Sequence, residues 1–186
     1  MTDETPAPPT DGELVKRVLN GDREAYATLA ERYSGPLAAL AFDRLGAVPE
    51  SQDAVQEALV IGFERLATLR DPSRFGSWLY EILRNLCALR IRRKGVERVH
   101  GRRLQAERPG STTATPLDSM LADERLVRLR SAVEGLTPSL REAIAIRYLS
   151  GAGRRESAAI LGVSQEAFDK RIERALRELR ETMKNG

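Results

Sequence analysis

Residues that could make or break covalent bonds are scarce in this chain of 186 residues. His100 is the sole histidine and Cys87 the sole cysteine; the first stands in a segment without helical pattern, the second on the apolar side of a helical pattern. The sequence contains no pair of metal ligands at a recognisable spacing and no Gly-rich phosphate loop. We therefore expect that the chain is not an enzyme, and we predict neither catalytic residues nor a metal site nor a cofactor.

Residues 154–168 instead have the pattern of a helix, a three-residue turn and a second helix. Ala158 is small enough for two helices to cross closely, and Gly162 stands where the chain needs a left-handed turn that costs glycine little. Ser164 is placed to cap the second helix. The pattern indicates a helix-turn-helix, which presents its second helix to the major groove of DNA. An ordinary helical hairpin with a solvated surface would have a similar pattern.

The second helix of this motif is amphipathic. Its apolar face consists of Phe168, Ile172, Ala175, Leu176 and Leu179. The remaining surface carries side chains suited to duplex DNA, namely Gln165, Lys170, Arg171, Arg174 and Arg177. Three carboxylates share that surface, Glu166, Asp169 and Glu173. Carboxylates repel phosphates, although they can accept a hydrogen bond from a cytosine amino group.

A second group of residues suited to nucleic acid lies on a predicted helix over about residues 77–94. The group begins with aromatic residues and continues with cations, namely Phe75, Trp78 and Tyr80, then Arg84, Arg90, Arg92, Arg93 and Lys94. Aromatic rings stack on unpaired bases while cations hold phosphates, a combination typical of single-stranded DNA binding. Asn85 could read a base edge or cap a turn. We expect Phe75 and Trp78 to be at least partly buried.

A third group lies on the preceding predicted helix. Asp53, Gln56 and Glu57 stand at positions i, i+3 and i+4, so they share one polar face. Such a face can form hydrogen bonds with a basic partner helix, because carboxylates pair well with arginine. A solvated surface would look the same.

The elements that carry these groups are predicted to be helices throughout. Aromatic residues make up 5% of the chain, hydrophobic residues 41%, and alternating strand-like runs are hard to find. The fold class is therefore all-α. Capping and breaking signals predict helices over residues 14–19, 22–33, 34–46, 49–69, 77–94, 117–135 and 137–150, followed by the helix-turn-helix.

The helical pattern fails in two places, which divides the chain. Residues 1–11 are acidic and Pro-rich and read as a disordered tail. Residues 96–122 contain Gly, Pro, Ser and Thr clusters and read as a flexible linker. We predict two small helical domains, over residues 12–95 and 123–186.

The composition indicates the cellular compartment in which the protein works. One cysteine allows no intramolecular disulfide, which favours a reducing compartment. No apolar run reaches the roughly 18 residues that span a bilayer, and the acidic N-terminal segment is unlike a signal peptide. We expect a cytoplasmic protein without membrane insertion. The net charge of +3 says little about nucleic acid, because binding depends on local clusters.

The order of these parts resembles that of the extracytoplasmic-function (ECF) sigma factors of the sigma-70 superfamily, compact bacterial sigma factors that keep only conserved regions two and four. The segment from Asp53 to Phe63 looks like the polymerase-binding helix of region two. The segment from Phe75 to Leu86 is similar to the family's melting and minus-ten helix, and residues 136–149 with 159–164 are similar to region four. The likeness covers roughly residues 12–95 and 123–183.

The resemblance implies a mechanism without covalent chemistry, because promoter melting needs only tighter binding to separated strands than to duplex. It implies that Asp53, Gln56 and Glu57 dock on the clamp helices of the largest polymerase subunit, with a second contact to the polymerase flap. Minus-ten DNA would meet Trp78, Arg84, Asn85, Arg90, Arg92, Arg93 and Lys94; minus-thirty-five DNA would meet Gln165, Lys170, Arg171 and Arg174. The linker would thread the polymerase channel, and a free monomer would be held inactive by an anti-sigma factor.

Two departures from the family pattern leave alternatives open. Leu89 stands where relatives usually carry an acidic residue, and the recognition helix holds the three carboxylates named above. One alternative is a stand-alone helix-turn-helix regulator whose N-terminal helices dimerise or sense a ligand. Another is a sigma-like decoy that sequesters an anti-sigma factor without reading DNA.

Overall fold

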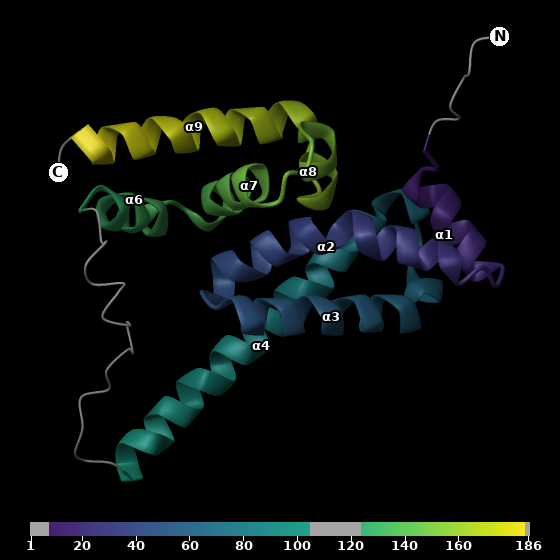
Figure 1. Ribbon diagram of the computed structural model, residues 1–186, viewed down its shortest axis with the longest axis horizontal. Coiled ribbons are helices and arrows are strands. Elements are labelled where there is room, and N and C mark those ends of the chain that lie inside the picture. Colours follow the sequence, from purple (N-terminus) through teal and green to yellow (C-terminus); the bar gives the residue numbers. More distant parts are fainter. Residues whose placement is uncertain (1–7, 105–123, 185–186) are drawn as a thin grey trace.

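The computed structural model describes residues 8–104 and 124–184 (Figure 1). No residue in these two ranges belongs to a β-strand, so the all-α prediction is confirmed. Residues 1–7 of the expected tail (1–11) and residues 105–122 of the expected linker (96–122) lie outside the described part.

The described helices form two units. The first contains α1 (Asp11–Leu19), α2 (Glu24–Leu45), α3 (Val48–Glu64) and α4 (Phe75–Leu104), with 3₁₀ turns at Leu66–Thr68 and Pro72–Arg74. The second contains α6 (Glu124–Gly135), α7 (Pro138–Leu149), α8 (Arg154–Ile160) and α9 (Gln165–Lys184). In Figure 1 the second unit lies along α2, while the C-terminal half of α4 projects away from the other helices.

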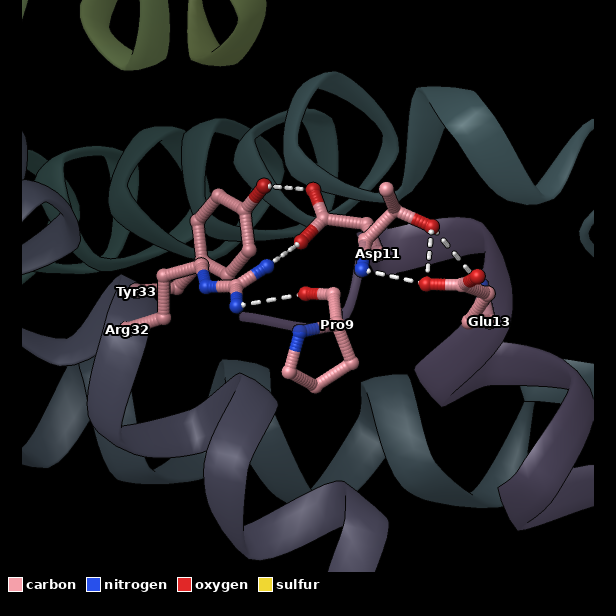
Figure 2. Close-up of polar contacts among 6 residues, drawn as sticks. Pro9, Asp11, Glu13, Arg32 and Tyr33 are labelled. Carbon is pink, nitrogen blue, oxygen red and sulfur yellow. Dashed lines mark hydrogen bonds and ion pairs between the residues drawn. The ribbon is translucent and has the colours of Figure 1, made fainter. Parts of the chain in front are cut away.

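The first unit begins earlier than the sequence analysis predicted. Thr10 caps α1 in a reciprocal capping box: its backbone N–H donates to the Glu13 carboxylate at 2.8 Å, and the Glu13 N–H donates to its hydroxyl at 3.3 Å (Figure 2). The boundary predicted at residues 11/12 is therefore wrong, because Thr10 and Asp11 are part of the folded unit. The spacing of Thr10 and Glu13 was the available signal.

A polar cluster fastens this beginning to α2. The Asp11 carboxylate accepts hydrogen bonds from the Arg32 guanidinium and the Tyr33 hydroxyl, and Arg32 also donates to the Pro9 carbonyl at 3.0 Å (Figure 2). Tyr33 is 1% exposed, and burial with the neighbouring Asp11 raises its pKa far above the usual range. Tyr33 therefore stays a neutral hydrogen-bond donor.

Helix α2 is continuous where the sequence predicted two helices that meet near Ser34. Pro36 lies inside it and is buried. A proline in a helix interior removes one backbone hydrogen bond, but Leu29, Leu37 and Leu40 on either side are fully buried, and their packing holds the helical path. The ends are as predicted: the Asp22 carboxylate accepts from the Ala25 N–H, and Gly46 ends the helix at φ 70°.

Helices α3 and α4 also differ from the predicted ranges. Helix α3 stops at Glu64 instead of Leu69, and the next residues form a 3₁₀ turn. Helix α4 continues past Lys94 to Leu104, so the first nine residues of the expected linker are helical and His100 falls within α4. One glycine in a helix costs about 1 kcal/mol relative to alanine, and Gly95 alone does not end the helix.

The second unit follows the predicted signals more closely. Thr137 occupies the N-cap of α7 with Pro138 at the first helical position, and Gly151 follows its end at φ 72°. Gly162 has the expected positive φ of 66°, and the Ser164 hydroxyl accepts from the Ala167 N–H at 3.1 Å. The helix-turn-helix is confirmed, with a turn over residues 161–164 that is one residue longer than predicted.

One apolar core runs through both units. Leu14, Leu29, Leu37, Phe75, Leu79 and Leu83 from the first unit are fully buried, and Ala143, Ile146, Ala158, Ile160 and Phe168 from the second belong to the same cluster. Helix α7 packs on α2 and α8 packs on α4. A smaller cluster of Ala132, Leu136, Leu140, Ala175 and Leu179 joins α6, α7 and α9. The two units are thus packed against each other.

We predict that Gly76→Ala destabilises the protein by about 1–3 kcal/mol, as overpacking of a filled core does. A Cβ at Gly76 would lie 2.7 Å from the buried Tyr33 ring. Gly95→Ala is the matched control, because no atom lies within 4 Å of its added Cβ, and it should stabilise α4 by about 0.5–1 kcal/mol. Urea unfolding followed by circular dichroism measures both. Equal stability of the two variants would contradict the close packing at Gly76.

Candidate nucleic-acid interface

The structure brings Asp53, Gln56 and Glu57 together on one exposed face of α3. The opposite face carries Ala54, Val55 and Ala58, which are at most 5% exposed and pack into the core. The polar face is therefore rigidly presented to solvent. It offers two carboxylates and one amide to a basic partner, as the spacing predicted.

The basic segment of α4 at residues 90–94 is tied to α3. Arg90 donates to the Glu57 carboxylate at 2.7 Å and to the Glu50 carbonyl at 3.0 Å, and Lys94 donates to the Glu50 carboxylate at 2.7 Å. Arg92 and Arg93 are exposed. Together with Arg84, which pairs with Glu81, three of the five predicted phosphate-binding cations thus have carboxylate partners. Exposed ion pairs are worth only about 0–1 kcal/mol, so a phosphate can replace these carboxylates at small cost.

The aromatic residues of α4 have unequal access to solvent. Phe75 is fully buried and Tyr80 is 5% exposed, so both belong to the core. Trp78 is half-buried, with its ring centroid 6.1 Å from that of Phe75, which confirms the expected partial burial. Of these three aromatic residues, Trp78 alone offers a ring surface to a base.

Trp78 lines a cleft of about 560 Å³. Arg70, Asp71, Arg74, Ser77 and Glu81 line it from the first unit, and Ile160, Leu161 and Gly162 from the helix-turn-helix. Arg84 and Asn85 are exposed further along α4; Arg84 pairs with Glu81 at 2.5 Å. Because Asn85 lies in the middle of α4, its amide caps no turn and is available to a ligand.

The predicted contacts to minus-thirty-five DNA gather on α9. Gln165, Lys170 and Arg174 are exposed and Arg171 is half-buried. With Thr137, Ser139 and Leu140, the three cations line a hollow of about 460 Å³ beside the start of α7. Hydroxyls, a helix N-terminus and cations at one place suit a phosphate group.

The carboxylates of the recognition helix are mostly paired. Glu166 accepts from Lys170 at 2.6 Å, and Asp169 lies 3.5 Å from the Arg154 guanidinium of α8. Within the described residues, Glu173 is the one of the three carboxylates without an ion-pair partner. Pairing reduces the repulsion that these carboxylates would exert on DNA phosphates.

The described residues offer little for other chemistry. Cys87 is fully buried, and burial raises the pKa of its thiol, which keeps it protonated and unreactive. Among the described residues, no group of His, Cys, Asp and Glu side chains could hold a metal ion. In the same part of the chain, no helix is long and apolar enough to span a membrane.

Sequence reasoning missed four charged residues between the units. Arg141 donates to the Asp43 carboxylate at 2.7 Å, and Arg44 forms an ion pair with Glu142. Arg44 also lies 3.3 Å from the Tyr80 hydroxyl. The partners are 98 residues apart in the chain, and each lies on a helix rich in charge, so no local pattern distinguishes them.

Comparisons with known proteins agree with this geometry. Residues 29–96 match the model of the family described as sigma-70 region 2. An ECF RNA polymerase sigma-E factor from Escherichia coli is 31% identical over 175 residues, which cover 89% of this chain and 90% of that protein. The ECF RNA polymerase sigma factor BldN from Streptomyces coelicolor is 30% identical over 170 residues, which cover 90% of this chain but 63% of that relative.

A solved structure has the same fold. CnrH, in complex with the cytosolic domain of CnrY, superposes with a TM-score of 0.59 at 24% identity and covers 94% of this chain and 97% of CnrH. This likeness concerns the arrangement of helices, while the sigma-E factor adds sequence identity over nearly its whole length. The chain belongs to the ECF RNA polymerase sigma factors.

Proposed function

We propose that this sigma factor binds core RNA polymerase through α3, recognises minus-ten DNA through α4 and minus-thirty-five DNA through α9, and helps to melt the promoter. The observation that carries the proposal is the exposed face of Asp53, Gln56 and Glu57 on a helix whose other side is buried, directly beside the cations of α4. One surface suits a basic protein partner and the adjacent one suits a nucleic acid.

Strand opening follows from differential binding. A duplex keeps its bases stacked and out of reach of Trp78, whereas a separated strand can place a base on the exposed part of the ring. Asn85 and the cations beyond it continue along the exposed side of α4 and can hold the same strand. Binding the open strand more tightly than the duplex shifts the equilibrium toward the open state without bond chemistry.

Recognition of the duplex is assigned to the beginning of α9. Lys170 and Arg174 pair with carboxylates four residues away on the same helix, at 2.6 and 2.8 Å. Such exposed pairs contribute about 0.3–0.5 kcal/mol, so they exchange readily for phosphates. Gln165, at the start of the helix, is placed to read a base edge.

Control by an anti-sigma factor is part of the proposal. An apolar groove of about 780 Å³ lies between α2, α6 and α7, and exposed Phe42, Tyr148 and Leu149 line it. Exposed apolar surface of this kind suits a protein partner. CnrH, which has the same fold, is bound to the cytosolic domain of CnrY in its solved structure, which supports a protein partner for this chain as well.

Run-off transcription on genomic promoter fragments, with purified core polymerase, tests the proposal as a whole. We expect core polymerase alone to start at random and the mixture to start at defined positions. A stand-alone regulator would instead bind duplex tightly without polymerase. A decoy would bind an anti-sigma factor and give no promoter selectivity, and either result would overturn the proposal.

The double variant Gln56→Lys/Glu57→Lys should weaken binding to core polymerase by tenfold or more, in the range of about 1.5–3 kcal/mol for lost charge-assisted hydrogen bonds. The matched control is Thr28→Lys/Glu31→Lys, which makes the same change of charge on exposed positions of α2. Binding is measured by fluorescence anisotropy of labelled protein. Equal affinities of the two variants would remove the assignment of the α3 face.

Asn85→Ala should reduce open-complex formation by about two- to tenfold, the effect of one lost hydrogen bond of 0.5–1.5 kcal/mol, while core binding stays unchanged. The residue is exposed, so the fold should not change. Permanganate footprinting of unpaired thymines measures the open complex, and Thr28→Ala on α2 is the control. A variant that opens promoters as well as the control would exclude Asn85 from strand binding.

A further inference from the structure

Four charged side chains join the two units in a fixed register. Asp43 and Arg44 are consecutive residues near the end of α2, and Arg141 and Glu142 are consecutive residues near the start of α7. The order of charges is reversed on the facing helix, so that Asp43 pairs with Arg141 and Arg44 with Glu142. We infer that these four residues form a latch that closes the free sigma factor and prevents it from reading both promoter elements at once.

The latch lies largely out of water. The Asp43 side chain is 6% exposed, and those of Glu142, Arg44 and Arg141 are 13%, 22% and 27% exposed. Charges that leave water must be paired, so sliding one unit along the other would leave buried charges without partners. The two ion pairs therefore select one register of α7 on α2.

The same burial keeps the closed state from being strongly favoured. Desolvation offsets most of the attraction within a buried ion pair. The second carboxylate oxygen of Asp43 and the Nε of Arg44 are buried and have no hydrogen-bond partner among the described residues, and water would satisfy both when the units separate. The latch is thus specific in geometry and weak in net energy, which is what a reversible contact needs.

Close backbone contacts accompany the latch. A Cβ on Gly35 of α2 would lie 3.4 Å from the Ser150 carbonyl at the end of α7, and one on Gly162 would lie 3.5 Å from the Cβ of Ser77. Gly162 and Leu161 also line the cleft that contains Trp78. In the closed arrangement, the turn of the helix-turn-helix forms one wall of the cleft that contains Trp78, the residue proposed to stack on a base of the open strand.

In the closed arrangement, the two surfaces proposed to bind DNA lie too close together to reach both promoter elements. Gln165 begins the recognition helix three residues after Gly162, so their Cα atoms are at most about 11 Å apart. Gly162 itself packs beside Ser77, the neighbour of Trp78. Minus-ten and minus-thirty-five elements are separated by about 25 base pairs, which is about 85 Å of DNA at 3.4 Å per base pair. The units must separate before both elements are bound. This consequence rests on the proposed function, whereas the latch itself does not.

The test uses the free full-length chain with no polymerase and no promoter. Arg44→Glu places two carboxylates together, and Glu142→Arg places two guanidinium groups together. Each reversal should lower the ratio of closed to open molecules by about a hundredfold or more, because breaking a buried ion pair destabilises the closed state by that amount. The double variant Arg44→Glu/Glu142→Arg restores opposite charges and should close again. Arg23→Glu, exposed at the other end of α2, is the control for the change of charge.

Two measurements report on the same equilibrium. Small-angle X-ray scattering gives the radius of gyration, which should rise for each single reversal and return in the double variant. Trp78 is the sole tryptophan, so acrylamide quenching of its fluorescence measures access to the cleft. Quenching should increase for each single reversal and return to the wild-type value in the double variant. Circular dichroism establishes that helicity is kept. If a reversal unfolds the chain, Arg44→Gln and Glu142→Gln remove charge without repulsion and should give a smaller shift in the same direction.

The outcomes separate the latch from the proposed function. Reversals that leave both the radius and the quenching as in the wild type overturn the latch, and so does a double variant that stays as open as the single ones. Promoter selectivity in run-off transcription is independent of these results. The latch can therefore fail while the proposed function stands, and the reverse also holds.

Discussion

The burial of both sides of α2 is the interaction on which the rest of the structure depends. Leu29, Tyr33, Leu37 and Leu40 are at most 1% exposed, because α1, α3 and α4 pack on one part of the helix and α7 on another (Figure 1). At 22 residues, α2 is about 33 Å long, enough to reach every one of these partners. Without this helix neither the face of α3 proposed to bind polymerase nor the side of α4 proposed to bind DNA would have a fixed position.

Tyr33 shows how this packing reaches the candidate site. Its ring lies 5.4 Å from that of Phe75 at the start of α4 and against the backbone of Gly76, while its hydroxyl holds Asp11 at the start of α1. Because its ring packs against α4 and its hydroxyl donates a hydrogen bond to α1, Tyr33 of α2 fixes the positions of these three helices relative to one another. The first turn of α4, which carries Trp78, therefore takes its position from contacts made well outside the surface proposed to bind DNA.

Sequence reasoning was most successful where the determining interaction is local. The helix-turn-helix, the Ser164 cap and the left-handed Gly162 each depend on residues within a few positions, and all three are present, with a turn one residue longer than predicted. It failed at Pro36 inside α2, where packing overrides a local preference, and at Gly95 inside α4, where a single glycine costs too little to end the helix. It had no means of finding the pair Asp43–Arg141, because only the three-dimensional fold brings these two residues together.

In the candidate site, the sequence likewise did not reveal an ion pair between residues that are distant in the chain. The sequence assigned Glu57 to a protein surface and Arg90 to a DNA surface, yet their side chains meet at 2.7 Å. If α3 is the face that binds polymerase, Glu57 exchanges Arg90 for a basic group of the partner, and Arg90 is then free to hold a phosphate. The exchange works in both directions, because a phosphate that takes Arg90 releases Glu57 for the partner. Thermodynamic linkage then requires that polymerase binding and strand binding strengthen each other by the same factor.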